Sequence, residues 1–329
     1  MPATLEDVAR AAGVSTATVS YVINAAKPVS AATRARVEAA IAELGYRPSP
    51  SARSLRTGQH HMLGLLLPDL ANPFFPALAQ AVAETARELG YGLMLSESGS
   101  DSASEDQALQ AMQQRVDGIV WVPETRNPDT RPYRPTVVID RVGPDLLEFD
   151  SVSSDHSLGG RLLARTIREL GHRRIGLLAG PADSVSARQR REALCTELGE
   201  LRPEWVLEVP YSSELPEAAV ELLRHTEVSL IVAANDAVAI GALRLLKACG
   251  RRVPEDVSLI GFDDIPWAVL VDPPLSTVSQ PVRAIGRSAV ELLHRRLAAP
   301  GGKPTHLVLP VEYVGRGSTR PQARKDLVA

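Results

Sequence analysis

Short apolar runs alternate with stretches of helical periodicity from residue 61 to residue 281, and this alternation constrains the fold most strongly. The seven runs are MLGLLL (62–67), YGLMLS (91–96), DGIVWV (117–122), TVVID (136–140), RIGLLAG (174–180), SLIVAAN (229–235) and VSLIGF (257–262). Helical patterns separate most of them, at residues 74–89, 103–115, 157–170, 187–198, 216–225 and 236–249. Strands that alternate with helices predict parallel sheets with helices on both faces, and the number of runs predicts two such sheets.

The first residues of the chain predict short helices instead. Thr4 is a natural N-cap, and Asp7 three residues later has the spacing of a capping box. Gly13 interrupts the apolar stripe that follows, because glycine permits a turn that other residues resist. Ser15 can then cap a second helix from residue 16 to about residue 24.

A third helix is predicted between Ser30, which suits an N-cap, and Gly45, which suits a left-handed C-cap. Residues 49–57 can form a linker helix, with Ser49 as the N-cap and Pro50 at the first helical position. Because so short a helix is unstable alone, we expect it to form conditionally.

Two helices joined by a turn that contains glycine are typical of the helix-turn-helix unit, although a plain amphipathic hairpin gives the same pattern. Charge favours the DNA-binding interpretation. Residues 1–60 carry seven Lys or Arg against four Asp or Glu, a net charge of +3, whereas the whole chain has −3. The second helix also carries polar side chains that suit base edges and phosphates.

The sequence from Thr4 to Leu55 resembles the DNA-binding domain of the LacI/GalR family of bacterial transcription regulators. The resemblance continues, in the family's order, through NPFF, DGIV, VVIDR, GHRRIG, ANDAVAIGAL, DVSLIGFDD and PPLSTVSQP. It implies an all-α helix-turn-helix head at 1–48, a hinge helix or linker at 49–60, and an α/β core of two doubly wound parallel-sheet lobes, like those of periplasmic binding proteins, at 61–329. The lobes are expected at about 61–152 with 282–307, and at about 153–281 with 308–329.

The resemblance implies a homodimer that places the second helix in the major groove of a pseudo-palindromic operator, with Thr16, Ala17 and Tyr21 facing the bases. Tyr21 stands where the family often has arginine, and tyrosine cannot read guanine bidentately. Leu55 matches the apolar residue that paired hinge helices insert into the minor groove, with Arg53 beside it. The predicted DNA-contacting residues are Thr4, Ser15, Thr16, Ala17, Thr18, Tyr21, Asn24, Ser30, Thr33, Arg53 and Leu55.

By the same resemblance, a small effector binds in the cleft between the lobes, at the ends of strands. The predicted effector-binding residues are Phe74, Phe75, Asp140, Arg190, Asn235 and Asp263. Carboxylates and an arginine around aromatic rings suit a sugar-like ligand, and they also suit a nucleobase. Asp236 is expected to cap the helix that follows it. The sequence does not choose between two roles for Asp155, Tyr211 and Trp267: each could line the pocket, or each could have an ordinary capping or packing role.

One segment departs from the family's pattern. Between DGIV and VVID, residues 123–135 are too few and too rich in proline for the helix that the family usually has there. This edge of the first lobe is therefore expected to be trimmed.

The sequence contains no GxGxxG, P-loop, GxSxG or HExxH motif and no metal-ligating spacing, so we expect neither catalysis nor a metal, and no cofactor beyond the effector. The sequence has neither a signal peptide nor an 18-residue apolar run, which favours a cytoplasmic protein without a membrane partner over a secreted sugar-binding protein. The prediction is a homodimeric DNA-binding repressor of carbohydrate genes, switched by a sugar-like effector. The alternatives are a purine-responsive or phosphoprotein-responsive regulator that is co-repressed, and a sugar-binding protein without a regulatory role.

Overall fold

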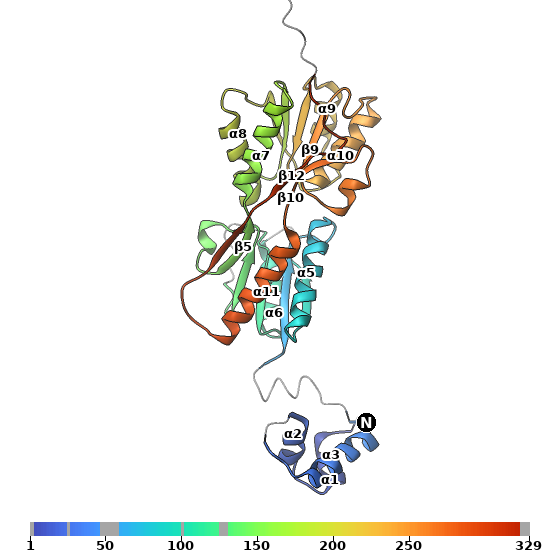
Figure 1. The fold of residues 1–329 in the computed structure, drawn as a ribbon, viewed down its shortest axis with the longest axis vertical. Coiled ribbons are helices and arrows are strands. Elements are labelled where there is room, and N and C mark those ends of the chain that lie inside the picture. The colour runs from blue at the N-terminus through green and yellow to red at the C-terminus, as the bar shows by residue number, and fades with distance from the viewer. Residues whose placement is uncertain (1–2, 25–26, 47–58, 100–101, 125–130, 323–329) are drawn as a thin grey trace, which may run out of the picture. The chain divides into compact units, whose positions relative to one another are not determined.

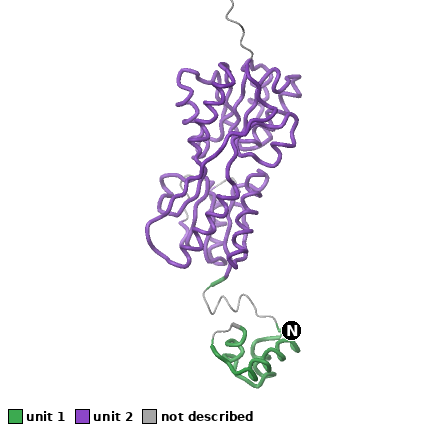
Figure 2. The backbone as a smooth tube through the Cα atoms, viewed as in Figure 1, with its two compact units in different colours: residues 1–60 green, residues 61–329 purple. Residues whose placement is uncertain are grey.

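The computed structural model describes residues 3–24, 27–46, 59–99, 102–124 and 131–322. The chain divides into two compact units, residues 1–60 and residues 61–329 (Figure 2). The predicted linker helix at residues 49–57, including Arg53 and Leu55, lies outside the described residues.

The described residues of the first unit form three helices, α1 (Leu5–Ala12), α2 (Thr16–Asn24) and α3 (Ala31–Leu44) (Figure 1). The capping box predicted for α1 is confirmed. The Thr4 hydroxyl accepts a hydrogen bond from the Asp7 N–H, and the Asp7 carboxylate accepts one from the Thr4 N–H at 3.0 Å. Gly13 ends α1 with a φ of +63°, a left-handed conformation in which a Cβ atom would be strained.

The caps predicted for α2 and α3 are also confirmed. Ser15 Oγ accepts a hydrogen bond from the Thr18 N–H at 3.2 Å, and Ser30 Oγ accepts one from the Thr33 N–H at 3.2 Å. The buried core of the three helices consists of Val8, Ala9, Ala12, Val19, Val22, Val37 and Ala40. Because these side chains are small, the helices pack closely and turn their polar faces outward.

In the second unit, the residues that the structure describes form two sheets of six strands each, and the predicted pair of parallel sheets is confirmed. In lobe one, β1 (Met62–Leu67), β2 (Gly92–Glu97), β3 (Gly118–Trp121), β4 (Thr136–Ile139), β5 (Asp150–Ser154) and β11 (His306–Leu309) are all parallel, in the order β11-β5-β4-β3-β1-β2. In lobe two, β6 (Ile175–Ala179), β7 (Trp205–Glu208), β8 (Leu230–Ala233), β9 (Ser258–Asp263), β10 (Ser276–Ser279) and β12 (Glu312–Val314) lie in the order β12-β10-β9-β8-β6-β7. The short β12 is antiparallel to β10, and the other pairs are parallel.

Helices cover both faces of the sheet in lobe one, as the alternation of side chains along β1 requires. Leu63 and Leu65 belong to the core formed with α5 (Phe74–Glu88) and α11 (Val282–Ala298). Leu66 belongs to the core on the opposite face, under α6 (Ser102–Gln113). Leucine at successive positions of β1 therefore supplies both cores.

Lobe two repeats this arrangement. Leu177 belongs to the core formed with α7 (His156–Glu169) and α8 (Val185–Leu198). Leu178 belongs to the core formed with α9 (Glu217–His225) and α10 (Asp236–Ala248). Two short 3-10 helices, η1 (Pro144–Leu146) and η2 (Pro266–Val269), follow β4 and β9.

The chain passes between the lobes three times, from β5 to α7, from β10 to α11 and from β11 to β12 (Figure 1). Five of the strands (β5, β7, β10, β11 and β12) and α11 were not predicted from the sequence. β5 reads DSVSS and β10 reads STVS, so neither shows an apolar run although both are largely buried. β7, at the edge of its sheet, alternates between half-buried and exposed residues. Between β3 and β4, the described residues include no helix, in line with the trimmed segment 123–135.

Candidate functional site

The outer face of α2 carries the residues predicted to face bases. Thr16 and Ala17 are exposed, Tyr21 is half-buried, and Asn24 is the last residue of the helix. The Lys27 ammonium lies 5.1 Å from the centre of the Tyr21 ring, a cation–π distance. A positive charge therefore accompanies the tyrosine on this face, and the sequence analysis did not single out Lys27.

Other predicted DNA-contacting residues also hold the first unit together. The hydroxyls of Thr4, Ser15 and Ser30 cap helices. The Ser15 and Thr18 hydroxyls lie 2.9 Å apart, and the Ser30 hydroxyl donates to the Thr33 hydroxyl at 2.9 Å. These hydroxyls keep part of their hydrogen-bonding capacity, and capping fixes their positions at the helix ends.

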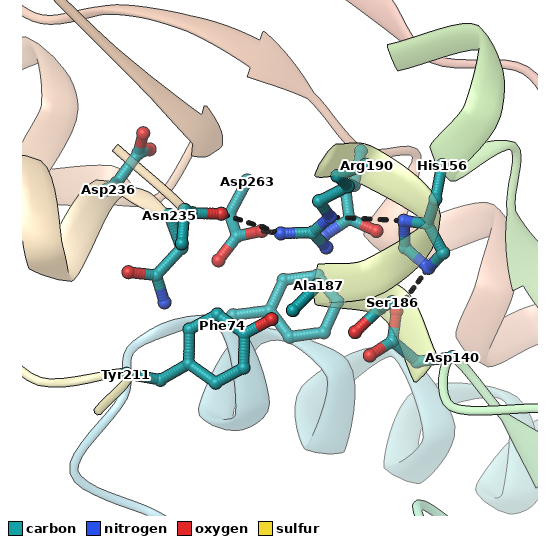
Figure 3. Close-up of polar contacts among 12 residues, drawn as sticks. Phe74, Asp140, His156, Ser186, Ala187, Arg190, Tyr211, Asn235, Asp236 and Asp263 are labelled. Carbon is teal, nitrogen blue, oxygen red and sulfur yellow. Dashed lines mark hydrogen bonds and ion pairs between the residues drawn. The ribbon is translucent and has the colours of Figure 1, made fainter. Parts of the chain in front are cut away.

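In the second unit, the structure brings all six predicted effector residues together in one pocket at the ends of strands between the lobes (Figure 3). The space between its lining side chains, counted together with the open solvent at its mouth, amounts to about 260 Å³. Its predicted residues are Phe74 and Phe75 from the start of α5, Asp140 after β4, Arg190 from α8, Asn235 after β8, and Asp263 at the end of β9. This is the position at which open parallel sheets bind ligands.

Arg190 is the most highly connected side chain of the pocket and is 8% exposed. Its Nη1 donates to the Ala234 carbonyl at 2.9 Å and lies 3.5 Å from Asp263 Oδ1. Its Nε donates to His156 Nδ1 at 3.2 Å, and its guanidinium carbon lies 3.7 Å from the centre of the Phe262 ring. A guanidinium held by so many contacts is a rigid, fixed positive charge.

The two pocket carboxylates have opposite electrostatic environments. Burial raises the pKa of Asp140, but His156 and the charges of Arg190 and Arg141 outweigh it and lower the pKa to about 2. Burial raises the pKa of Asp263 to about 7; Asp140 adds to this rise, while Arg190 and Gln280 oppose it. At neutral pH the pocket thus contains one ionised carboxylate and one that titrates.

The role expected for Asp236 is wrong. Asn235 caps α10, because its Oδ1 accepts from the Val238 N–H at 2.9 Å. Asp236 is fully buried and accepts from the Ile265 N–H at 2.9 Å and from the Thr277 hydroxyl at 2.6 Å. Burial and the neighbouring Asp263 raise the pKa of Asp236. The capping bond uses one lone pair of the Asn235 oxygen, so the amide NH2 and the second lone pair are the groups that Asn235 offers to a ligand.

The structure also decides the positions that the sequence left open. Tyr211 lines the pocket, beside Phe74 in Figure 3. Asp155 caps α7 by accepting from the Leu158 N–H at 2.7 Å, and Trp267 is 46% exposed on η2 and is not among the lining residues.

Sequence analysis missed further lining residues, namely Asn72, Arg141, Ser186 and Gln280. The Gln280 amide donates to Asp263 Oδ1 at 2.7 Å, while its Oε1 is buried and has no hydrogen-bond partner within the described ranges of the chain. Arg141 bonds to Glu124 in lobe one, and its guanidinium carbon lies 5.8 Å from the Tyr211 ring of lobe two. The sequence offered one signal for Arg141 and Gln280, which is their place in or beside a motif: Arg141 follows Asp140, and Gln280 ends STVSQ.

In the described parts of the chain, no three His, Cys, Asp or Glu residues are grouped in a way that could hold a metal ion. Within the same residues, no helix is both long enough and apolar enough to cross a bilayer.

A three-helix unit of helix-turn-helix type, together with a two-lobed body whose pocket gathers polar groups from both sheets, defines a ligand-binding transcription regulator. Residues 4–49 match the family described as "Bacterial regulatory proteins, lacI family", and residues 164–319 match "Periplasmic binding protein-like domain". The chain is 36% identical to the ribose operon repressor of Escherichia coli K12, over 96% of this chain and 99% of the relative. It is 34% identical to the HTH-type transcriptional repressor PurR of Aliivibrio fischeri, over 96% and 98%. The chain belongs to the LacI family.

Solved structures agree with this classification. The lac repressor dimer bound to operator and the anti-inducer ONPF superposes with a TM-score of 0.85 and is 31% identical, covering 97% of this chain and all of that chain. A LacI-family regulator from Enterococcus faecalis V583 with bound ribose has a TM-score of 0.71 and 27% identity, covering 79% of this chain and 99% of its own.

Proposed function

We propose that this protein is a dimeric repressor that binds operator DNA through α2 and is released when a small neutral sugar occupies the pocket between the lobes. The observation that carries the proposal is the convergence of Asp140, Arg190, Asn235 and Asp263 around aromatic side chains in that pocket. The chain acts by binding, not by catalysis. Phosphorylated sugars and nucleobases are the competing effectors.

The charges of the pocket favour a neutral ligand over a phosphorylated one. Arg141 is paired with Glu124, and Arg190 faces Asp263 and, through His156, Asp140. Each guanidinium therefore has a carboxylate partner nearby, and no excess of positive charge is available for a phosphate. Carboxylates and amides that accept and donate hydrogen bonds are instead the groups that bind vicinal hydroxyls.

The pocket has an aromatic lining, which favours a sugar. The Phe74 and Phe75 rings, with centroids 5.4 Å apart, and the Tyr211 ring give it apolar surface for the C–H face of a sugar. The names of the relatives support the same ligand class, since one is a ribose operon repressor and a solved neighbour contains ribose. D-ribose is therefore the first compound to test.

Release of the operator requires that the sugar bind one state of the dimer better than the other. Weakening operator binding about 100-fold needs about 2.7 kcal/mol of coupling. Three segments of the chain connect the two lobes, so they can act as a hinge when the lobes close on a sugar.

The test begins with thermal unfolding of the full chain in the presence of D-ribose, other pentoses and hexoses, ribose 5-phosphate and purine bases. A ligand that binds the folded state raises the melting temperature. The compound that stabilises is then added to a titration with DNA fragments that the protein selects from its genome. Stabilisation by a neutral sugar with weaker operator binding supports the proposal. Stabilisation by a purine alone, or tighter operator binding with the sugar, contradicts it.

A further inference from the structure

We propose that His156 is a positioning residue of the effector pocket, which as a neutral imidazole fixes the Asp140 carboxylate of lobe one and the Arg190 guanidinium of lobe two. The part of this proposal that concerns effector binding rests on the function proposed above. His156 is not among the lining residues of the pocket; it lies next to Arg190 and Asp140, which are (Figure 3).

The contact with Arg190 determines the tautomer of His156. Arg190 Nε carries a hydrogen and donates it to His156 Nδ1 at 3.2 Å. Nδ1 must therefore present a lone pair, because two N–H groups cannot share one hydrogen bond. A neutral imidazole with a bare Nδ1 carries its hydrogen on Nε2.

The contact with Asp140 places that hydrogen near a carboxylate. His156 Nε2 lies 3.0 Å from Asp140 Oδ1, an ion-pair distance, and neither atom makes a hydrogen bond of regular geometry with any of the described residues. With Oδ1 facing the imidazole, the second carboxylate oxygen of Asp140 is left for a ligand hydroxyl. His156 thus connects the ends of the pocket that come from different sheets.

The packing around His156 explains how it reaches both partners. It is the first residue of α7, which Asp155 caps, and it is 2% exposed. A Cβ atom on Gly159 would lie 2.5 Å from the Phe262 ring, and one on Gly160 would lie 2.6 Å from the Arg190 carbonyl oxygen. The two glycines therefore allow α7 to approach β9 and α8 closely, which places the imidazole beside Arg190.

The charges around His156 keep it neutral. Burial and Arg190 lower the pKa of His156, against the opposite influence of Asp140. On the other elements packed against it, the charged groups are Asp140 after β4 and Arg190 on α8, while β9 presents the Phe262 ring and, beyond Arg190, Asp263. Protonation would place a second cation against Arg190 and remove the acceptor for its Nε.

Histidine 15N resonances of the full-length protein test this inference without any ligand. Nitrogen shifts distinguish a bare ring nitrogen from a protonated one, and His156→Gln identifies the signal. His225→Gln, at a 69% exposed side chain on α9, is the control that removes a different signal. We expect an Nε2–H tautomer for His156 that is unchanged between about pH 5.5 and pH 8. A signal that titrates in this range, or an Nδ1–H tautomer, would overturn the proposal.

Variants then separate the two contacts in a D-ribose titration by calorimetry. The amide of His156→Gln can replace Nε2 at Asp140, and the amide oxygen of His156→Asn can replace Nδ1 at Arg190, whereas His156→Leu replaces neither. We expect each amide variant to bind ribose about tenfold more weakly and the leucine variant about 100-fold more weakly, or about 1.4 and 2.7 kcal/mol. His225→Gln should bind like the wild type.

The outcomes separate this inference from the proposed function. Binding by His156→Leu within about threefold of wild type overturns the inference, as does equal loss in all three variants, which would indicate a purely structural role. If the leucine variant does not fold, the ribose affinities of the two amide variants and the tautomer seen by NMR still test the positioning role of His156. If wild type does not bind ribose at all, the ribose proposal fails, and the tautomer measurement alone tests His156.

Discussion

Asp140 and Asp263 face one pocket from two different sheets, and each stands at a strand end with a positive φ, +64° for Asp140 and +117° for Asp263. Positive φ is unfavourable for residues with a Cβ atom, so both backbones are strained where the ligand site lies. Their pKa values are displaced in opposite directions, to about 2 and about 7. The pocket therefore offers one permanent anion and one carboxyl group whose charge depends on pH.

This difference predicts the pH dependence of stability. The folded-state pKa of Asp263 is about 7, above its ordinary value of 3.8, so its contribution to stability is full below pH 3.8 and is lost as pH rises through about 7. Compared with Asp263→Asn, the free energy of unfolding of the wild type should fall by up to about 1.4 kcal/mol per pH unit from pH 5 to about pH 7 and then level off.

Denaturant unfolding of both proteins at several pH values measures this difference. Asp140, with its lowered pKa, contributes stability that is lost only as pH falls through about 2, outside this window. His156, with its lowered pKa, makes stability rise with pH, but it does so in both proteins and cancels in the comparison. Parallel curves for wild type and Asp263→Asn would show that Asp263 has an ordinary pKa.

Substitutions in the pocket should abolish the effector response. Asp263→Ala and Arg190→Ala each remove a hydrogen-bonding partner of charged type, worth about 1.5–3 kcal/mol, so ribose affinity should fall at least tenfold. Operator affinity without effector should persist, because the helix-turn-helix residues lie in a separate compact unit. Calorimetry and DNA-binding anisotropy measure the two quantities. A normal ribose response in both variants would show that the effector binds elsewhere.

Residues on the outer face of α2 should set operator preference. Thr16→Ala and Tyr21→Ala should change which bases are preferred, at about 1–3 kcal/mol per lost specific contact. Ser15→Ala should weaken binding to all sequences alike, because it removes a helix cap and a phosphate-facing hydroxyl. Selection from a randomised DNA library reads both effects. An unchanged preferred sequence for Tyr21→Ala would place this residue outside the base-reading set.

Leu55 in the linker should matter for specific DNA binding alone. Its insertion into the minor groove costs a few kcal/mol of unstacking, which is recovered only in the bent specific complex. Leu55→Ala should therefore lose most operator binding yet bind random DNA like the wild type, in competition titrations at one salt concentration. An equal loss on both DNAs would refute the wedge role.

Much of the fold could be predicted from local sequence. Thr4, Ser15 and Ser30 cap the helices that the sequence assigned to them, since each cap depends on residues within three positions. Leucine-rich β1 is recognisable because both of its faces are buried. β5 and β10 could not be predicted in the same way, because serines that are buried by neighbouring elements carry no apolar signal.

The site was predictable to the extent that its residues follow strands. The capping role was given to Asp236 instead of Asn235 because either residue can cap a helix. The choice depends on Ile265 and Thr277, which lie far away in sequence and bind the Asp236 carboxylate. His156 was missed for a similar reason, since Arg190 meets it through the packing of α7 against α8, and Asp140 meets it from the end of β4.

The central claim is that a sugar bound between the lobes controls the affinity of this protein for its operator. Its most direct test is an anisotropy titration of a genomically selected operator at fixed salt, with and without saturating D-ribose or the neutral sugar that most raises the melting temperature. The account predicts that the sugar weakens operator binding about 100-fold, a coupling of about 2.7 kcal/mol. Superimposable titration curves, with a sugar that demonstrably binds, would contradict it.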